Sequence, residues 1–276
     1  MKCAWQEFLR VIPTELRSEV DRLGRGGLWE LRLRIGMPPE LVGPWGSKWL
    51  MEITKKSDIQ YVINGASQYS PWAAKTVTQG YLTTSGGHRI GLCGQAVMQN
   101  GSVLSLKEPS SLCIRVARDH PGIAKGIPDQ GSVLIIGRPG AGKTTLLRDL
   151  IRMRSQNGTQ AISVVDERGE LFPVGAFDPG SRTDILHGCP KPAGIGMLLR
   201  TMSPGAIAVD EITADDDCDA LLQSGWCGVE LLATAHAANR EELNRRPIYQ
   251  KLIKNRLFDW LVILQQDKSW RLERME

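Results

Sequence analysis

One octapeptide limits the possible folds of this chain more than any other feature of its sequence. Residues 137–144 read Gly-Arg-Pro-Gly-Ala-Gly-Lys-Thr and fit the pattern G-x-x-x-x-G-K-[ST] of a phosphate-binding loop, or P-loop. An apolar run at 133–136 precedes the loop, and a leucine-rich segment of helical character, 146–150, follows it. Because both flanks that a P-loop requires are present, the sequence predicts a nucleotide-binding domain of the α/β class.

The residues of this loop have separate expected roles. Glycines let the backbone curl so that successive NH groups point at phosphate oxygens, and the following helix N-terminus adds partial positive charge. We expect Lys143 to reach the β- and γ-phosphates and Thr144 to ligate Mg²⁺. The alternative, a glycine-rich turn without a ligand, is disfavoured by the flanking strand and helix. The predicted nucleotide-binding set is Gly137, Arg138, Pro139, Gly140, Ala141, Gly142, Lys143, Thr144 and Thr145.

A pair of acids follows the apolar run 206–209. Asp210 and Glu211 stand where a strand of a parallel sheet would end, which is the edge where open α/β sheets bind ligands. Asp210 is expected to hold Mg²⁺, through water, and Glu211 to polarise the attacking water. An acid pair at a strand end can also be a helix cap, but downstream of a P-loop the catalytic interpretation is favoured.

Two further strand ends carry candidate residues. Asp166 and Glu167 close the run 161–165, and one of them is predicted to help orient water; the alternative is an ion pair with the adjacent Arg168. His236 follows the run 231–235 and is expected to sense the γ-phosphate or to link it to a neighbouring subunit, although a lone histidine is often structural.

Other charged groups have simpler explanations. The run of Asp215, Asp216, Asp217 and Asp219 follows Thr213, a plausible N-cap, so these carboxylates are expected to complement a helix dipole rather than to bind metal. The C-terminal basic residues between 240 and 256 are interpreted as a solvated helix face. A net charge of +4 is far from that of a dedicated nucleic-acid binder. The sequence has no Asn-Lys-x-Asp motif after the P-loop, so ATP is favoured over GTP.

The length of 276 residues favours two domains, since a typical domain has roughly 100–200 residues. Residues 31–35 alternate apolar and basic side chains, as in a half-buried strand, and 80–118 reads as short strands joined by hairpins. We therefore predict an N-terminal α+β domain at 1–120, a linker at 121–131 and a P-loop domain with a mostly parallel sheet at 132–276. No apolar run approaches the roughly 18 residues that cross a bilayer, so a cytoplasmic location is expected.

Taken together, these motifs resemble the secretion-ATPase superfamily, the motors of type II and type IV secretion and of pili, and within it the sporulation ATPases of endospore-forming bacteria. The resemblance covers most of the chain. It is carried, beside the P-loop, by residues 30–36, 86–91, 165–168, 182–184, 188–191, 199–204, 209–212 and 234–236.

This resemblance implies a RecA-like core joined to a smaller N-terminal domain, with six subunits in a homo-oligomeric ring. It assigns Asp166 and Glu167 to an acidic box and His236 to a histidine box, and it makes Arg89 an arginine finger, with Arg115 as a second candidate. An arginine finger stabilises transition-state charge and can accelerate hydrolysis by about 10³–10⁵. The implied task is to power a sporulation channel or secretion complex between mother cell and forespore, from the cytoplasmic face of its membrane-embedded components in the mother cell.

Two other functions remain open at this stage. The first is a nucleic-acid-binding ATPase, since related P-loop rings move DNA or RNA; salt-dependent DNA binding would distinguish it. The second is a non-catalytic scaffold that uses ATP only to stabilise a ring. The complete set of Lys143, Thr144, Asp210 and Glu211 argues against the scaffold, because a scaffold does not need the water-activating acid.

Overall fold

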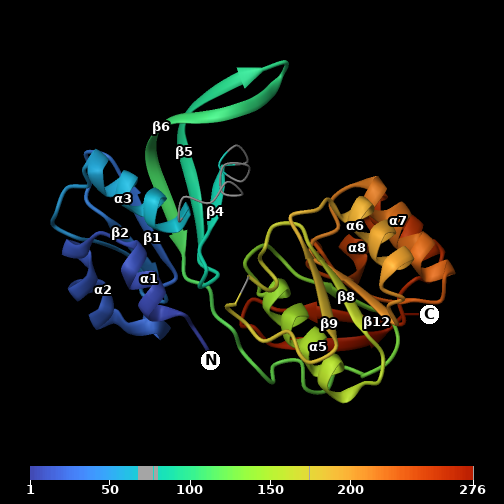
Figure 1. Ribbon diagram of the computed structural model, residues 1–276. Coiled ribbons are helices and arrows are strands. Elements are labelled where there is room, and N and C mark those ends of the chain that lie inside the picture. The colour runs from blue at the N-terminus through green and yellow to red at the C-terminus, as the bar shows by residue number, and fades with distance from the viewer. Residues whose placement is uncertain (68–76, 78–79, 174, 276) are drawn as a thin grey trace. The chain divides into compact units, whose positions relative to one another are not determined.

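The computed structural model describes residues 1–67, 77, 80–173 and 175–275 of the chain. Two compact units can be distinguished in it: Met1–Asp119 with Pro173–Ala176, and His120–Phe172 with Phe177–Glu276. Each unit contains its own cluster of buried apolar side chains. In Figure 1, residues 1–119 run from blue to green and residues 120–275 from green to red.

The first unit is an α+β structure built on an antiparallel sheet. Its six strands have the order β3-β2-β1-β6-β5-β4. In β1, Leu31 and Leu33 are fully buried while Glu30, Arg32 and Arg34 are half-buried, so the predicted alternation is confirmed for 31–34. It was wrong for Ile35, which follows the end of β1 and is 41% exposed. The elements are α1 (Trp5–Val11), α2 (Thr14–Gly27), β1 (Glu30–Arg34), β2 (Glu40–Gly43), β3 (Gly46–Trp49), α3 (Lys56–Ser67), β4 (Tyr81–Thr83), β5 (Arg89–Gln99) and β6 (Ser102–Arg115).

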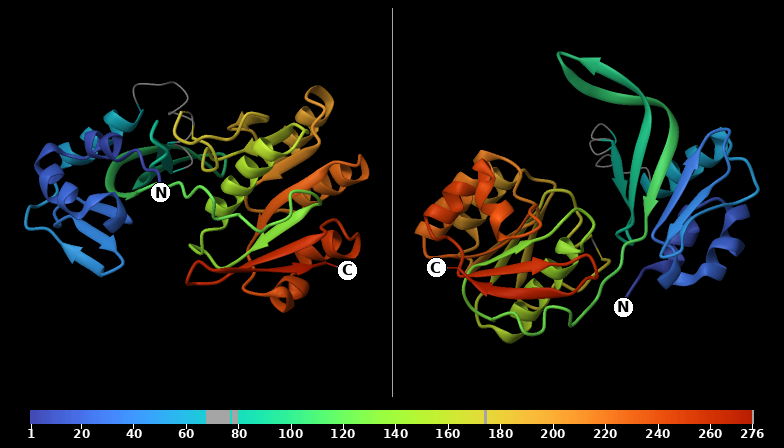
Figure 2. Two further views of the ribbon diagram at one scale, coloured as in Figure 1. Left: turned by 90° about the horizontal axis from the view of Figure 1, so that it is seen from below. Right: turned by 180° about the vertical axis from the view of Figure 1, so that it is seen from behind.

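Strands β5 and β6 form a long hairpin that projects beyond the rest of their sheet, as Figures 1 and 2 show. The sequence predicted separate short strands here, whereas β6 is one strand with an irregularity in its middle. The two strands approach closely at that point, since a Cβ at Gly94 would lie 2.7 Å from the Glu108 carbonyl oxygen.

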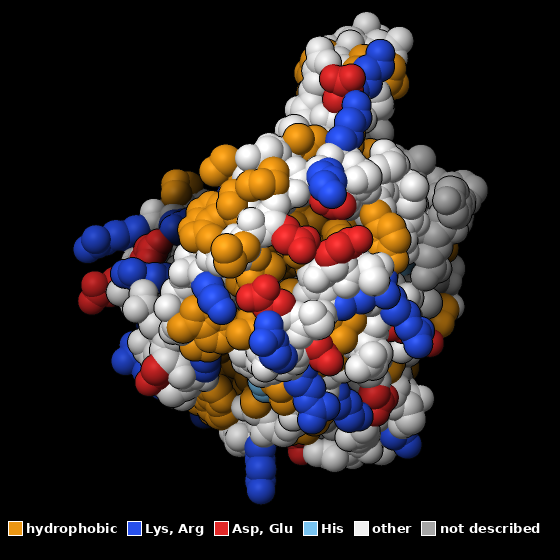
Figure 3. Space-filling view, turned by 90° about the vertical axis from the view of Figure 1, so that its left-hand side faces the viewer, with side chains coloured by type: hydrophobic (Ala, Val, Ile, Leu, Met, Phe, Trp, Pro, Cys, Tyr) orange, Lys and Arg blue, Asp and Glu red, His pale blue; other side chains and the backbone are white. Residues whose placement is uncertain are grey.

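Hydrophobic side chains gather on the face of the molecule drawn in Figure 3.

The second unit has the predicted α/β architecture, with a mostly parallel sheet. Its seven strands have the order β13-β12-β7-β11-β10-β8-β9. Among the described strands of this sheet, β12 and β13 pair antiparallel and the other neighbours pair parallel. The strands are β7 (Val133–Ile136), β8 (Ile162–Asp166), β9 (Thr183–His187), β10 (Ala206–Val209), β11 (Glu230–Ala235), β12 (Trp260–Leu264) and β13 (Trp270–Arg274).

Helices cover both faces of this sheet. The helices α6 (Lys191–Thr201), α7 (Asp215–Trp226), α8 (Arg240–Arg245) and α9 (Pro247–Lys254) share one apolar cluster with alternate strand residues such as Val209 and Ala233. Helix α5 (Lys143–Asn157) lies against the other face (Figure 1). All four residues of β7 and of β10 are buried, as expected for strands covered on both sides.

Residues 120–131 are irregular and belong to the second unit. Ala124 and Ile127 are buried, and the backbone NH of Ala124 donates to Asp149 Oδ2 in α5 at 2.8 Å. The segment predicted as a linker is thus packed against the second unit along part of its length; the predicted domain boundaries themselves stay a prediction. Among the described residues, no helix is both long enough and apolar enough to cross a membrane.

Candidate functional site

The P-loop connects β7 to α5, in the arrangement that the sequence predicted. Gly140 and Gly142 have φ angles of 73° and 106°, in the left-handed region that favours glycine. Within the described chain, no side chain caps the first turn of α5 and no acidic residue lies in it. The amino end of α5 and the curled loop therefore offer backbone donors and partial positive charge to an anion.

Lys143 lies inside the loop that it is predicted to serve. Its Nζ donates to the carbonyl oxygens of Gly137 and Arg138 at 3.0 and 3.2 Å, and it lies 3.0 Å from His236 Nδ1. Burial lowers the pKa of Lys143, while the nearby charges of Asp210 and Glu211 oppose that shift. The ammonium group is therefore held by neutral acceptors, two carbonyl oxygens and an imidazole nitrogen, which an anionic phosphate can replace.

Asp210 is positioned between two hydroxyl groups at the end of β10. Thr144 Oγ1 donates to its Oδ2 at 2.7 Å, and Thr234 Oγ1 donates to its Oδ1 at 2.6 Å. Burial raises the pKa of Asp210, and the two hydroxyl hydrogen bonds counteract that shift. Thr144 and Asp210 are thus in direct contact, and their hard oxygen atoms fit Mg²⁺, which prefers such ligands together with water.

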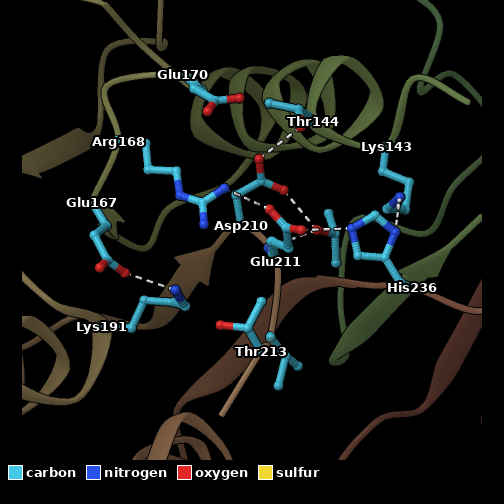
Figure 4. A network of polar contacts seen from close by, with 12 residues as sticks. Lys143, Thr144, Glu167, Arg168, Glu170, Lys191, Asp210, Glu211, Thr213 and His236 are labelled. Carbon is cyan, nitrogen blue, oxygen red and sulfur yellow. Dashed lines mark hydrogen bonds and ion pairs between the residues drawn. The ribbon is translucent and has the colours of Figure 1, made fainter. Parts of the chain in front are cut away.

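Glu211 is connected to Lys143 through His236 (Figure 4). His236 Nε2 lies 2.6 Å from Glu211 Oε1. Because an ammonium group can only donate, Nδ1 accepts from Lys143, and the neutral ring then carries its proton on Nε2 and donates to Glu211. This sequence of contacts joins the P-loop lysine to the predicted water-polarising acid.

The environment of Glu211 keeps its carboxylate ionised. Burial would raise its pKa, but the hydrogen bond from His236 and the charge of Arg168 outweigh burial, so the pKa lies below the ordinary value. A group that polarises water must be ionised to accept a proton, and Glu211 meets that requirement at neutral pH. Its φ of 56° is unusual for a residue other than glycine.

Three contributors to this site were not named as functional by the sequence analysis. Arg168 pairs with Glu211 at 3.0 Å, whereas the sequence analysis considered it only as an alternative ion-pair partner of Asp166 and Glu167. Thr234 bridges the two acids of β10, and Tyr249 Oη accepts a hydrogen bond from the His236 backbone NH at 3.2 Å. For Thr234 the available signal was its position, since it stands two residues before a candidate histidine at a strand end.

Asp166 and Glu167 end β8, beside β10, but their described contacts differ from those of Asp210 and Glu211. Asp166 is 2% exposed and accepts hydrogen bonds from the backbone NH groups of Glu170 and Phe172, both at 2.9 Å. Glu167 pairs with Lys191 at 2.7 Å. Burial raises the pKa of Asp166, and the backbone hydrogen bonds counteract the shift. A role for these two residues in orienting water stays a prediction.

The remaining candidates lie in α5 and in the first unit. Thr145 is half-buried in the first turn of α5, directly after the predicted Mg²⁺ ligand Thr144. Arg89 begins β5, and its guanidinium lies over the ring of Tyr81, 4.7 Å from the centroid. Its role as an arginine finger stays a prediction.

The acidic run at 215–219 lies in the first turns of α7. This helix begins at Asp215 and its N-cap is Ala214, not Thr213 as predicted. Asp217 accepts hydrogen bonds from the backbone NH groups of Thr213 and Ala214.

The fold and the loop together define the class of this protein as a RecA-like α/β fold with a P-loop. Solved structures support that fold. The pilus retraction motor PilT with bound ADP has a TM-score of 0.65 at 16% identity, covering 95% of this chain and 82% of its own. The ATPase DotB of Legionella pneumophila has a TM-score of 0.60 at 15% identity, covering 99% and 80%.

The family is given by sequence comparison. The family model for "Sporulation stage III, protein AA" matches residues 5–271, and the chain belongs to that family. Stage III sporulation protein AA of Bacillus subtilis (strain 168) is 36% identical over 95% of this chain and 92% of its own length. The protein SEEDLING PLASTID DEVELOPMENT 1 of Arabidopsis thaliana is 30% identical over 89% of this chain, but only 35% of that protein is covered. The resemblance to secretion ATPases and their sporulation members is thus confirmed.

Proposed function

We propose that this chain is a Mg²⁺-dependent ATPase of the secretion-ATPase type, which acts as a ring motor for a sporulation channel or secretion complex. One observation carries the catalytic part of the proposal: Thr144 of the P-loop contacts Asp210, while Glu211 beside it is linked through His236 to Lys143. These contacts bring together the side chains that ATP hydrolysis requires.

In the proposed reaction, Lys143 exchanges its contacts with the Gly137 and Arg138 carbonyl oxygens for the β- and γ-phosphates of ATP. Thr144 and Asp210 would hold Mg²⁺, which neutralises phosphate charge when it is bound. Glu211 accepts a hydrogen bond from the attacking water and orients it toward the γ-phosphate. His236 holds the Glu211 carboxylate through Nε2 and responds to the departure of Lys143 from Nδ1.

The assembly and cellular role rest on the family and on the resemblance. We propose a homo-oligomeric ring of six subunits, in which Arg89 supplies positive charge to the γ-phosphate from its own or a neighbouring subunit. The proposed partners are membrane-embedded components of a channel between mother cell and forespore, contacted from the mother-cell cytoplasm. The sporulation family and the RecA-like fold support this role.

The test measures phosphate release by the purified full-length chain with Mg²⁺ and ATP, alongside its sedimentation with and without nucleotide. The Glu211→Gln variant is expected to lose at least about 100-fold in turnover, because amide oxygen is a poor base, yet to keep nucleotide binding. Glu241→Gln, an exposed acid in the first turn of α8, is the matched control and should retain turnover.

The outcomes separate the alternatives. Hydrolysis that requires Glu211 in a ring-sized species supports the motor. Nucleotide binding without hydrolysis, in the wild type and in both variants, would contradict the enzymatic proposal and favour a scaffold. DNA binding that weakens steeply with salt would favour a nucleic-acid-binding ATPase instead.

A further inference from the structure

Strand β11 lies between β7, which leads into the P-loop, and β10, which leads into Asp210. Near its carboxyl end it carries a polar side chain, Thr234. Thr234 of β11 pairs in register with Ile135 of β7, and the preceding residue, Ala233, pairs with Val209 of β10. Ala233 and Ala235 belong to the apolar cluster beneath α6 to α9. Because side chains alternate along a strand, Thr234 points to the opposite face. Its side chain is completely buried.

The hydroxyl group of Thr234 makes contact with both acids at the end of β10. Its Oγ1 donates to Asp210 Oδ1 at 2.6 Å and accepts from the Glu211 backbone NH at 2.8 Å. A single hydroxyl has one hydrogen to donate, so the donor is used on the carboxylate and a lone pair is used on the amide. The Thr234 carbonyl oxygen also accepts from the Ile212 NH at 2.9 Å.

These contacts fall on a strained segment of backbone. Glu211 has a φ of 56°, and a residue other than glycine in that region carries a conformational cost. The hydrogen bonds on either side of Glu211, from its own NH and from the Ile212 NH, both end on Thr234. Thr234 therefore holds the backbone turn that directs the Glu211 carboxylate toward His236.

We infer that Thr234 is a positioning residue for the reaction, acting through Asp210 and Glu211 without contacting the nucleotide. It fixes one oxygen of Asp210, so that Oδ2 remains directed toward Thr144, the residue that would hold Mg²⁺ together with Asp210. At the same time it fixes the peptide that carries the water-polarising acid. This inference rests on the proposed ATPase activity, which it deepens by adding a residue that sets the geometry of both acids.

The experiment compares Thr234→Val with Thr234→Ser in the full-length protein. Valine keeps the β-branched shape but leaves the Glu211 NH and Asp210 Oδ1 without the hydroxyl, whereas serine retains it. Because a hydrogen bond to a charged group contributes about 1.5–3 kcal/mol, kcat should fall about 10- to 100-fold in Thr234→Val. KM for ATP should change by less than about threefold, and Thr234→Ser should recover most of the turnover.

A second measurement does not depend on hydrolysis. Binding of a fluorescent ATP analogue is titrated with Mg²⁺, and the half-saturating Mg²⁺ concentration should rise about 10-fold or more in Thr234→Val, because Asp210 loses its fixed orientation. Ser163→Ala is the matched control: Ser163 is a fully buried hydroxyl on β8 whose Oγ has no hydrogen-bond partner among the described residues. It should match the wild type in both measurements.

The two proposals can fail separately. If the wild type does not hydrolyse ATP, the proposed function fails, while the Mg²⁺ titration still decides the role of Thr234. An unchanged Mg²⁺ requirement and unchanged kcat in Thr234→Val would overturn the inference, as would equal losses in Thr234→Val and Thr234→Ser. If Thr234→Val does not fold, as judged by thermal unfolding, Thr234→Ala takes its place with the same expected pattern.

Discussion

The same dipeptide, Asp-Glu, ends two neighbouring strands of the parallel sheet, and the two copies have different surroundings. Val165 of β8 pairs in register with Val209 of β10, so Asp166 and Asp210 leave the sheet side by side. Asp210 accepts hydrogen bonds from two side-chain hydroxyls, one of them on the P-loop helix. Asp166 instead accepts from two backbone NH groups of the turn that follows it.

This difference shows that position at the ligand-binding edge of a sheet is not enough to give an acid a role in chemistry. Asp166 is buried and Asp210 is half-buried, and burial raises the pKa of both carboxyl groups. What separates them is the kind of donor. Hydroxyl groups can rotate toward a metal ion and exchange partners, whereas amide groups of a turn are fixed by the backbone. The comparison predicts a catalytic defect for changes at Asp210 and a folding defect for changes at Asp166.

The largest expected effect is the loss of activity in Asp210→Asn. The amide removes the negative charge that Mg²⁺ requires, so turnover should fall by at least about 100-fold, as when a transition-state contact is removed. Stability should fall less than in Asp166→Asn, because the two hydroxyl donors on Asp210 can rotate toward other acceptors, whereas backbone donors cannot. Phosphate release and urea unfolding measure the two effects.

Unchanged turnover in Asp210→Asn would contradict the proposed difference between the two aspartates, because Asp210 would then be a structural acid like Asp166. A large loss of unfolding free energy would also contradict it. The half-saturating Mg²⁺ concentration for binding of an ATP analogue should also rise, because a neutral amide oxygen binds the ion more weakly than a carboxylate does.

The next effect in size is the loss of stability in Asp166→Asn. Each carboxylate oxygen of Asp166 accepts one backbone NH, from Glu170 and from Phe172. An amide NH₂ would face one of these donors, and leaving a buried donor unsatisfied costs about 1–3 kcal/mol. The free energy of unfolding should fall by about that amount. Urea unfolding at neutral pH, followed by circular dichroism, measures it.

Asp166→Asn should retain turnover within about threefold at temperatures where the protein is folded, because the hydrogen bonds of Asp166 described above go to Glu170 and Phe172 and not to Asp210 or Glu211. Asp178→Asn provides a matched control, since Asp178 accepts a backbone NH on an exposed loop of the same unit. A 100-fold loss of turnover with unchanged stability would instead support the predicted water-orienting role of the acidic pair.

The sequence allowed the strands that carry the site to be predicted, because each is a short apolar run that ends in a functional residue. The predicted runs 133–136 and 206–209 coincide with β7 and β10, and those ending at 165 and 235 agree with β8 and β11 to within one residue. The P-loop and its helix were equally accessible, since glycine spacing is a local signal. The mostly parallel sheet followed from the alternation of strands and helices, and it is confirmed.

The order of the strands was not predictable in the same way, because it depends on contacts between distant segments. Nothing in the local sequence indicates that β11 lies between β7 and β10, and this order is what brings Thr234 to Asp210. The partner of Arg168 was missed for the same reason: its neighbour in sequence is Glu167, but its neighbour in space is Glu211. The strands β9, β12 and β13 were also not predicted.

Arg168 gives the smallest prediction and the sharpest test of the comparison, because it follows β8 yet pairs with the acid of β10 at 3.0 Å (Figure 4). Its side chain is 48% exposed and that of Glu211 is 31% exposed. Since an exposed ion pair contributes about 0.2–1 kcal/mol, kcat in Arg168→Gln should fall by only about 1.5- to 5-fold. The control is Arg271→Gln, which removes a similarly exposed pair with Glu273 at 3.2 Å and should leave kcat unchanged. A 100-fold loss in Arg168→Gln would mean that Arg168 contacts the reacting phosphate, and the ends of β8 and β10 would then act as one catalytic unit.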